Sequence, residues 1–377
     1  MDIGPIMFPK HRMPRSRPWW PLCLVLLLLG GCDCGTTLQD WDPTPYEIEI
    51  PPFFPPMDIP ADNPLTVEGV ALGRLLFWET TLSSDGSMSC GSCHMPEHSF
   101  AEPTPYSTGV TGAVGTRNAM ALINLGWSNA FLWDGRMPTL EDQIRDPISH
   151  PDEMNLPWPE ATSRLQAHVD QPNYPQLFWE AFGSEEITED LTVQAIAQFV
   201  RTMVSSDSKF DHWRRGELDL TNNEYSGYQI FLREGVDPEN VPGGQFGGDC
   251  FHCHGEAGLQ FTDHLFHNNG LDSVFLVDPG HAWVSGNPLD SGKFRTPTLR
   301  NVALSAPYMH DGRFGTLQEV IDHYNVGGVP SSTLDPFMKY SYGGLSLAPS
   351  QKANLLAFLH TLTDTAFTQN PAFQNPH

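Results

Sequence analysis

The chain has 377 residues, with 45 acidic against 20 basic side chains and a formal net charge of −25. Such an acidic chain lacks the basic footprint that nucleic-acid binding requires, which argues against a nucleic-acid partner and favours a protein partner with a basic docking face. The length is sufficient for two domains of ordinary size.

The N-terminus has the pattern of an export signal. Four basic residues precede an apolar run over 22–29, which is too short to span a bilayer. The run ends in Leu29-Gly30-Gly31-Cys32, which resembles a bacterial lipobox. The sequence therefore predicts a signal peptide over 1–31, acylation of Cys32 and anchoring of the protein to a membrane by lipid. The alternative is an ordinary secretory signal in which Cys32 and Cys34 are incidental.

A proline-rich segment over 32–64 follows the signal and predicts a semi-extended, non-helical tether. Helical patterns then recur along the chain, separated by loops rich in glycine and proline. They predict helices over 67–77, 158–169, 191–204, 222–234, 316–325 and 349–362. Alternating patterns typical of strands are not convincing anywhere, so the predicted fold class is all-α.

Two copies of Cys-x-x-Cys-His carry the strongest chemical signal, since this spacing attaches a c-type haem covalently. Cys90 and Cys93 precede His94, and Cys250 and Cys253 precede His254. The thiols bond the porphyrin, and the histidine ligates the iron. Zinc sites or redox-active cysteine pairs are the alternatives, but zinc half-sites usually lie close together whereas these motifs are far apart. Two covalently bound c-type haems in an exported chain indicate the periplasmic side of a Gram-negative membrane.

Similar motifs follow each haem signal in the same order. Arg117-Asn118, Asp134-Gly135-Arg136 and Thr139-Leu140-Glu141 come after the first, and Arg300-Asn301, Asp311-Gly312-Arg313 and Thr316-Leu317 come after the second. Each copy closes with an amphipathic helix, which we expect to pack on another terminal helix and bury the haem. We predict two tandem cytochrome c-like haem domains related by internal duplication, over 65–210 and 211–365, and a tail over 366–377.

Across roughly 60–365 the sequence resembles the bacterial dihaem cytochrome c peroxidase family, in its MauG-like branch. The motifs that carry the resemblance include Leu72-Gly73-Arg74-Leu75-Leu76-Phe77, Phe131-Leu132-Trp133-Asp134-Gly135-Arg136, Glu153-Met154-Asn155 and Leu299-Arg300-Asn301-Val302-Ala303-Leu304-Ser305-Ala306-Pro307-Tyr308. The resemblance implies that hydrogen peroxide reacts at the N-terminal haem. It also implies that the C-terminal haem stores or relays electrons.

The resemblance implies three catalytic residues. Glu153 matches the family's acid–base residue above the first haem, which moves the proton that turns a peroxide oxygen into water. Gln143 matches the distal-pocket glutamine. Trp133 matches a tryptophan between the two haems that relays electrons, although a tryptophan in an apolar setting is more often simply part of a core.

The resemblance also implies an inter-haem calcium site. Asn118 and the backbone carbonyls of Ser305 and Pro307 match its ligands, which are the oxygen donors that a hard cation prefers. The alternative is that Asn118 caps a turn.

Two positions depart from ordinary family peroxidases. Val110 stands where many members carry a removable distal histidine, so we expect a five-coordinate first haem, with His98 folding back as the alternative. Tyr324 stands at the usual methionine position and is the predicted sixth ligand of the second haem. A phenolate favours ferric and higher-valent iron. The side chains that compete with it are Met309, Met338 and His323.

Three functions are compatible with these residues. The first is a peroxide-dependent dihaem oxidoreductase that takes electrons from a small redox protein, either a c-type cytochrome or a cupredoxin, or from a protein substrate. The alternative is a periplasmic dihaem electron-transfer cytochrome without peroxidase chemistry, which requires two six-coordinate haems. The third is a lipid-tethered sensor. A homodimer is compatible with the resemblance, and the sequence does not separate detoxification from cofactor maturation.

Overall fold

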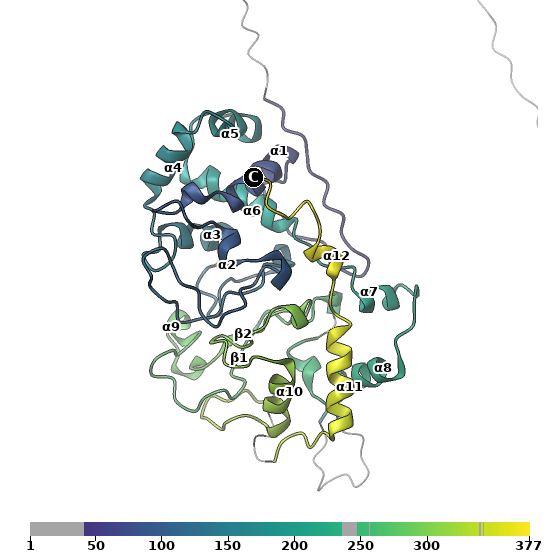
Figure 1. The fold of residues 1–377 in the computed structure, drawn as a ribbon. Helices are drawn as coiled ribbons and strands as arrows, with labels where there is room; N and C mark the ends of the chain where they lie inside the picture. The colour runs from purple at the N-terminus through teal and green to yellow at the C-terminus, as the bar shows by residue number, and fades with distance from the viewer. Residues whose placement is uncertain (1–40, 236–246, 256, 339–340, 342) are drawn as a thin grey trace, which may run out of the picture. The chain divides into compact units, whose positions relative to one another are not determined.

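A computed structural model describes residues 41–377 except 236–246, 256, 339–340 and 342 (Figure 1). The predicted signal peptide, Cys32 and the start of the tether lie outside the described residues. Within the described part of the chain, no helix is both long enough and apolar enough to cross a membrane.

The described residues are mostly helical, as the all-α prediction requires (Figure 1). The helices are α1 (Val67–Trp78), α2 (Cys90–Cys93), α3 (Leu140–Ser149), α4 (Trp158–Ala167), α5 (Tyr174–Phe182), α6 (Glu189–Arg201), α7 (Lys209–Arg214), α8 (Asn222–Phe231), α9 (Ala282–Ser285), α10 (Leu317–Val326), α11 (Pro349–His360) and α12 (Thr365–Thr368). Two short strands, β1 (Phe266–His267) and β2 (Phe294–Arg295), pair antiparallel.

All six predicted helices are present, with ends that shift by up to three residues. The sequence did not predict α3, α5 and α7, or the four-residue helices α2, α9 and α12. Proline explains two of these omissions, because Pro147 lies inside α3 and Pro175 lies in the first turn of α5. A proline is tolerated in a first turn, but inside a helix it removes a backbone hydrogen bond. Tertiary packing of α3 on α6 compensates for that loss.

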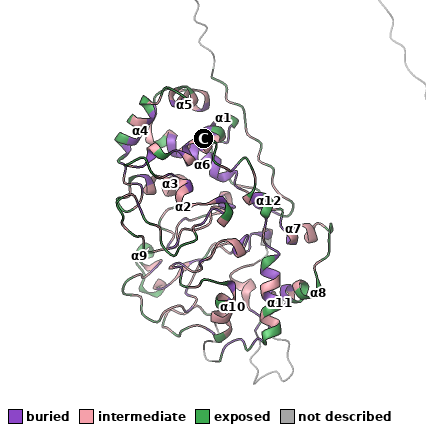
Figure 2. Cartoon of the chain, in the orientation of Figure 1, coloured by how far each residue is buried: buried purple, intermediate pink, exposed green. Residues whose placement is uncertain are grey.

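Two hydrophobic cores occupy the two halves of the described chain (Figure 2). The first is built on α1 and on α3 to α6, and the second on α7, α8, α10 and α11. Phe367 and Phe373, from the predicted tail, pack in the first core, whereas Phe54 of the predicted tether packs in the second. The ends of the globular region therefore contribute side chains to both cores. The domain boundaries stay a prediction.

A terminal helix pair crosses at a glycine in each half. In the first half α1 packs on α6, and a Cβ added at Gly73 would lie 1.9 Å from the carbonyl oxygen of Ala195. In the second half α8 packs on α11, and a Cβ at Gly227 would lie 1.9 Å from the carbonyl oxygen of Asn354. Only glycine permits this backbone approach. The closing helices thus pack as predicted.

The two halves also repeat a set of loop contacts. Asn124 and Asn301 both adopt a left-handed backbone conformation. Their backbone N–H groups donate to Met203 O and Leu362 O respectively, both at 3.0 Å. Each asparagine lies ten residues before the aspartate of Asp-Gly-Arg. The equivalent of Asn301 is therefore Asn124 and not Asn118, which corrects the sequence alignment. The shared Arg-Asn dipeptide favours the other alignment, but the spacing to Asp-Gly-Arg and the backbone contacts support this one.

Candidate dihaem active site

Both haem-motif histidines are held in the orientation that iron ligation requires. Nδ1 of His94 lies 2.8 Å from the carbonyl oxygen of Phe100, and Nδ1 of His254 lies 3.1 Å from that of Phe261. A protonated Nδ1 that donates to a carbonyl leaves the lone pair of Nε2 free for a metal. Each imidazole is thus oriented by a hydrogen bond to the backbone of a phenylalanine six or seven residues further along the chain.

The titration behaviour of the motif residues fits haem attachment. Burial lowers the pKa of His94, and it lowers that of His254 to about 4, so both imidazoles are neutral and can ligate. Burial raises the pKa of Cys90 and Cys250 to about 12 and that of Cys93 to about 11. Cysteines that exchange disulfides have lowered pKa values instead. These thiols therefore do not fit a redox-active pair.

The first haem motif opens into a cavity of about 1,420 Å³, larger than the roughly 300–1,000 Å³ of an ordinary ligand pocket. Cys90, Cys93 and His94 line it. The three predicted catalytic residues, Trp133, Gln143 and Glu153, line the same cavity. Gln143 lines the cavity, and its Oε1 is buried with no hydrogen-bond partner among the described residues, so this acceptor is available to a bound ligand. The cavity fits a macrocycle with a polar distal pocket.

Glu153 is held by backbone contacts in the turn after α3. Its amide donates to His150 O at 3.1 Å, and its carbonyl accepts from Val110 N at 2.9 Å. The neighbouring Gly109 packs so closely that an added Cβ would lie 2.0 Å from Asp152 O. The loop over 109–115 therefore fixes the turn that carries the carboxyl group.

The environment of Glu153 raises the pKa of its carboxyl group. Burial is the largest cause, Asp146 and Asp152 act in the same direction, and His150 and Arg136 oppose them. A raised pKa suits a carboxyl group that must accept and release a proton near neutral pH. His150 also lines the cavity and was not predicted, because nothing in the sequence distinguished it from the other histidines.

The loop that carries a distal histidine in many peroxidases contributes no imidazole here. Thr108, Gly109, Val114 and Gly115 line the cavity, whereas Val110 is not among the lining residues. His98 ends a short 3₁₀ turn, Pro96–His98, and is not among them either. Refolding of His98 toward the first haem therefore finds no support in the contacts of the described residues.

Trp133 lies where the two halves meet. Its Nε1 donates to Asn118 O at 2.8 Å, and its own carbonyl accepts from Arg295 N at 2.8 Å. Reciprocally, Asn118 N donates to His310 O at 2.7 Å. The guanidinium of Arg117 adds ion pairs to Asp134 and Asp278, both at 2.7 Å. Loops that carry site residues in one half thus form bonds to loops of the other half.

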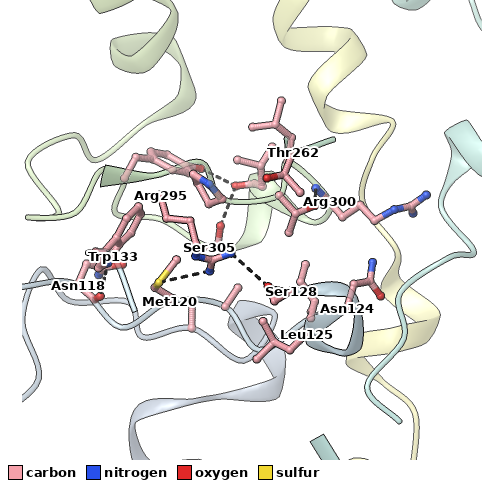
Figure 3. Close-up of a pocket in the computed structure, with 18 of the residues that line it drawn as sticks. Asn118, Met120, Asn124, Leu125, Ser128, Trp133, Thr262, Arg295, Arg300 and Ser305 are labelled. Carbon is pink, nitrogen blue, oxygen red and sulfur yellow. Dashed lines mark hydrogen bonds between the residues drawn. The ribbon is translucent and has the colours of Figure 1, made fainter. Parts of the chain in front are cut away.

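The three predicted calcium ligands line a smaller pocket of about 90 Å³ between the halves, and two of them, Asn118 and Ser305, are labelled in Figure 3. Asn118, Ser305 and Pro307 all line it, together with Trp133 and Arg295. Its lining residues, all of them described, include no aspartate or glutamate. The predicted ligands are brought together, but a cation there would need negative charge from outside the protein chain.

Tyr324 lies on α10 with a buried phenol group. Its hydroxyl accepts from Nδ2 of Asn269 at 3.2 Å, and Sδ of Met309 accepts from the same amide at 3.4 Å. Nε2 of His323 lies 2.9 Å from Asn269 O, so that imidazole is already engaged. Burial raises the pKa of Tyr324 to about 12, and the hydrogen bond from Asn269 partly opposes this. Asn269 thus gathers Tyr324 and Met309, two of the predicted ligand candidates.

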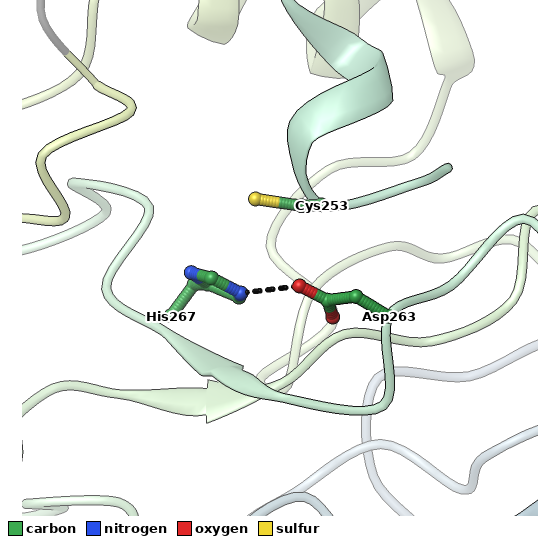
Figure 4. A group of neighbouring side chains, drawn as sticks. All are labelled: Cys253, Asp263 and His267. Atoms are coloured by element: carbon green, nitrogen blue, oxygen red, sulfur yellow. Dashed lines mark hydrogen bonds and ion pairs between the residues drawn. The ribbon is translucent and has the colours of Figure 1, made fainter.

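A cluster of charged groups surrounds the second cysteine of the second motif (Figure 4). Ligand atoms of Cys253, Asp263 and His267 lie within 4.8 Å of one another. However, Nε2 of His267 pairs with Asp263 at 2.8 Å, and its Nδ1 pairs with Asp335 at 2.6 Å. Burial alone would lower the pKa of His267, but Asp263 and Asp335, with a further contribution from the Cys253 sulfur, raise it to about 12. With both ring nitrogens occupied, His267 forms an ion pair and is not a metal ligand.

Comparison with known proteins gives consistent results. The family described as di-haem cytochrome c peroxidase matches residues 67–219. The methylamine utilization protein MauG of Methylorubrum extorquens is 38% identical, over 80% of this chain and 80% of the relative. The cytochrome c551 peroxidase of Nitrosomonas europaea is 32% identical, over 71% of this chain and 76% of the relative.

Solved structures agree with these relatives. A MauG-like protein associated with microbial copper homeostasis superposes with a TM-score of 0.77 at 35% identity, covering 88% of this chain and 99% of that one. The diheme peroxidase BthA of Burkholderia thailandensis has a TM-score of 0.66 at 21% identity, over 83% of this chain and 91% of that one, and so supports the fold alone.

Proposed function

Because the chain belongs to the di-haem cytochrome c peroxidase family, we propose that this peroxidase reduces hydrogen peroxide at its first haem with electrons relayed through its second. The overall change is that one peroxide, two electrons and two protons become two waters. The observation that carries the proposal is the single cavity that joins His94 to Glu153, Gln143 and Trp133. Bound haem would supply the iron at which peroxide binds and is reduced.

The protein's own contribution at the first haem is proton movement. Glu153 accepts the proton of the bound peroxide and returns it to the departing oxygen, which leaves as water. Its raised pKa makes the protonated carboxyl group, which must form between the two steps, easier to form. Gln143, whose Oε1 is free of other partners among the described residues, orients the peroxide. Val110 leaves the distal side without a protein ligand, so peroxide binding needs no prior reduction.

Electron transfer between the two halves passes Trp133. Its indole lines both the large cavity and the smaller pocket between the halves. Hydrogen bonds to Asn118 and Arg295 hold it on either side. An apolar ring in a fixed position across this boundary shortens the gap that an electron must cross.

Tyr324 would hold the second haem as a ligand, and a phenolate in that role would favour the more oxidised states of iron. Its high pKa in the protein alone means that proton loss depends on the positive charge of ferric iron. With Tyr324 as its ligand, bound haem would supply a site that retains oxidising equivalents more readily than it donates electrons. This favours a protein substrate as the electron source over a small redox protein.

Calcium and the lipid anchor complete the proposal. Asn118, Ser305 and Pro307 hold calcium only if the haem carboxylates balance its charge, since the described pocket lining has none. Removal of the ion with a chelator should then slow electron transfer between the haems. Acylated Cys32, outside the described residues, holds the protein on the periplasmic face, and a Cys32→Ala variant should leave the detergent phase on partitioning.

The deciding experiment records absorption and paramagnetic resonance spectra of the ferric protein before and after one equivalent of peroxide. We expect a high-spin haem beside a low-spin haem, and a long-lived oxidised state that decays when a protein substrate is supplied. Two low-spin haems that are inert to peroxide would instead establish an electron-transfer cytochrome and overturn the proposal.

A further inference from the structure

The pocket between the two halves contains two buried nitrogens that lack a hydrogen-bond partner among the described residues. They are Nε of Arg295 and Nδ1 of His264, and both residues line the pocket (Figure 3). Arg295 extends from β2, and only 6% of its surface is exposed. The charge of Arg295 also lowers the pKa of His264. Burial is the largest cause of that lowering, and Arg295 is the second. The two side chains therefore share one space.

Arg295 differs from the other buried arginines of the described chain. Arg300 pairs with Asp211 at 2.7 Å, and Arg201 pairs with Glu141 at 2.7 Å. The guanidinium of Arg295 instead contacts two neutral acceptors, Ser128 Oγ at 3.3 Å and Met120 Sδ at 3.7 Å. A buried charge without an opposite charge is strongly unfavourable. Burial lowers its pKa to about 10, so it remains a cation at neutral pH.

The surroundings of the pocket identify a carboxylate as the missing partner. Its lining residues, all described, include no acidic side chain, and about 90 Å³ accommodates a carboxylate group with ordered water. Met120 lies beside His94, whose imidazole also contacts the Met120 carbonyl, and Pro297 lies beside His254 in the same way. The pocket thus adjoins the iron-ligating histidine of each half, and a haem held by either histidine would carry two carboxylate side chains.

We propose that Arg295 and His264 form a binding site for a haem propionate and that this pairing sets the reduction potential of the haem that supplies it. The fork of a guanidinium binds a carboxylate through two hydrogen bonds, and His264 adds a third donor. The inference rests on haem attachment within the proposed function and is independent of peroxide turnover. The propionate can belong to either haem, and the experiment separates the two sources.

The physical consequence is electrostatic. An ionised propionate near the iron stabilises the ferric state, and a buried guanidinium that pairs with it compensates for that charge. Removing the guanidinium should therefore lower the reduction potential of one haem. It should also raise the pKa of the propionate and make the potential depend on pH across the neutral range, because a desolvated carboxylate without a cation holds its proton more tightly.

The test uses the holoprotein and spectroelectrochemical titration without peroxide. For Arg295→Gln we expect the ferric-to-ferrous ratio of one haem, measured at a fixed applied potential, to change at least tenfold. This corresponds to a shift of about 59 mV in the reduction potential of a one-electron couple. The haem whose spectrum shifts identifies the propionate. Arg215→Gln is the control, since it removes the same charge from a more accessible ion pair with Asp207 and Glu217. Arg295→Lys should recover part of the shift.

Thermal unfolding of the same proteins provides a second readout. If a propionate occupies the pocket, Arg295→Gln leaves a buried anion unpaired and lowers the melting temperature. Unchanged potentials together with a raised melting temperature would overturn the proposal, because the cation would then be unpaired in the holoprotein. Wild-type potentials that follow the acetate or chloride concentration would also overturn it, in favour of an anion from solution. If Arg295→Gln does not fold, Arg295→Lys and His264→Asn give the same readouts.

Discussion

Replacement of Glu153 by glutamine tests the proposed chemistry most directly. The substitution keeps the size of the side chain and its capacity for hydrogen bonds but removes the group that carries a proton. The turn should persist, because the hydrogen bonds that hold it, to His150 and Val110, are formed by the backbone of residue 153. A loss of activity can then be assigned to the carboxyl group and not to unfolding of the site.

The expected loss follows from the role of the group. A positioned acid–base residue contributes about 10²–10⁴-fold to a rate, which corresponds to about 2.7–5.4 kcal/mol in the activation barrier. The raised pKa of Glu153 also predicts a pH profile. Because the free carboxylate must accept the first proton, kcat/KM should fall as pH decreases through a value above the ordinary glutamate pKa. His150 lowers the pKa of Glu153, so His150→Asn should raise that pKa. The fall in kcat/KM should then occur at higher pH.

The assay is steady-state reduction of peroxide with a chemically reduced donor, accompanied by spectra of both haems. Glu160→Gln is the matched control, because Glu160 is 54% exposed and pairs with Arg164 on the surface of α4. We expect the control to keep its activity. Turnover of Glu153→Gln within threefold of wild type, with unchanged haem spectra, would show that another group moves the proton.

Three further predictions address the second half. Tyr324→Met should raise the potential of the second haem, because a thioether favours ferrous iron, and an unchanged titration would exclude Tyr324 as its ligand. Gly227→Ala should cost about 1–3 kcal/mol in denaturant unfolding by forcing α8 and α11 apart, whereas Gly315→Ala, with 3.7 Å to its nearest atom, should be nearly neutral. His267 has a pKa of about 12 against an ordinary 6.5, so its stabilisation is complete below pH 6.5 and is lost as pH rises toward 12. The stability difference between wild type and His267→Gln should therefore shrink in alkaline solution, and a constant difference would contradict the ion pair.

The sequence predicts those features that depend on short spacing. Each haem motif lies within five residues, and the helix patterns within about a dozen, so both can be read locally. Glu153, Gln143 and Trp133 were assigned through family resemblance, and the structure places all three on one cavity. By contrast, α3 was missed because Pro147 interrupts its local pattern, although packing on α6 supports the helix.

The contacts that the sequence did not reveal join residues that are far apart along the chain. Asn269 bonds to Tyr324 across 55 positions, and Arg295 reaches Met120 across 175. No local pattern encodes such pairs. The internal repeat does contain one sequence signal for Arg295. When Asn124 is aligned with Asn301, Asn118 is aligned with Arg295. That alignment shows a polar amide in one half replaced by a cation in the other.

The exchange of backbone hydrogen bonds between the halves bears on how such a chain arose. The backbone N–H of Asn118 donates to the carbonyl of His310, and the backbone N–H of Arg295 donates to the carbonyl of Trp133. In the alignment of the two halves, Asn118 corresponds to Arg295, and Trp133 corresponds to His310. A reciprocal pair of this kind is what an isologous contact between two identical subunits produces. Under the predicted internal duplication, a single-haem ancestor that paired with itself would already have formed this contact before duplication and fusion. Fusion of two such copies would keep both sides of the contact in one chain and leave the other residues of each half free to diverge.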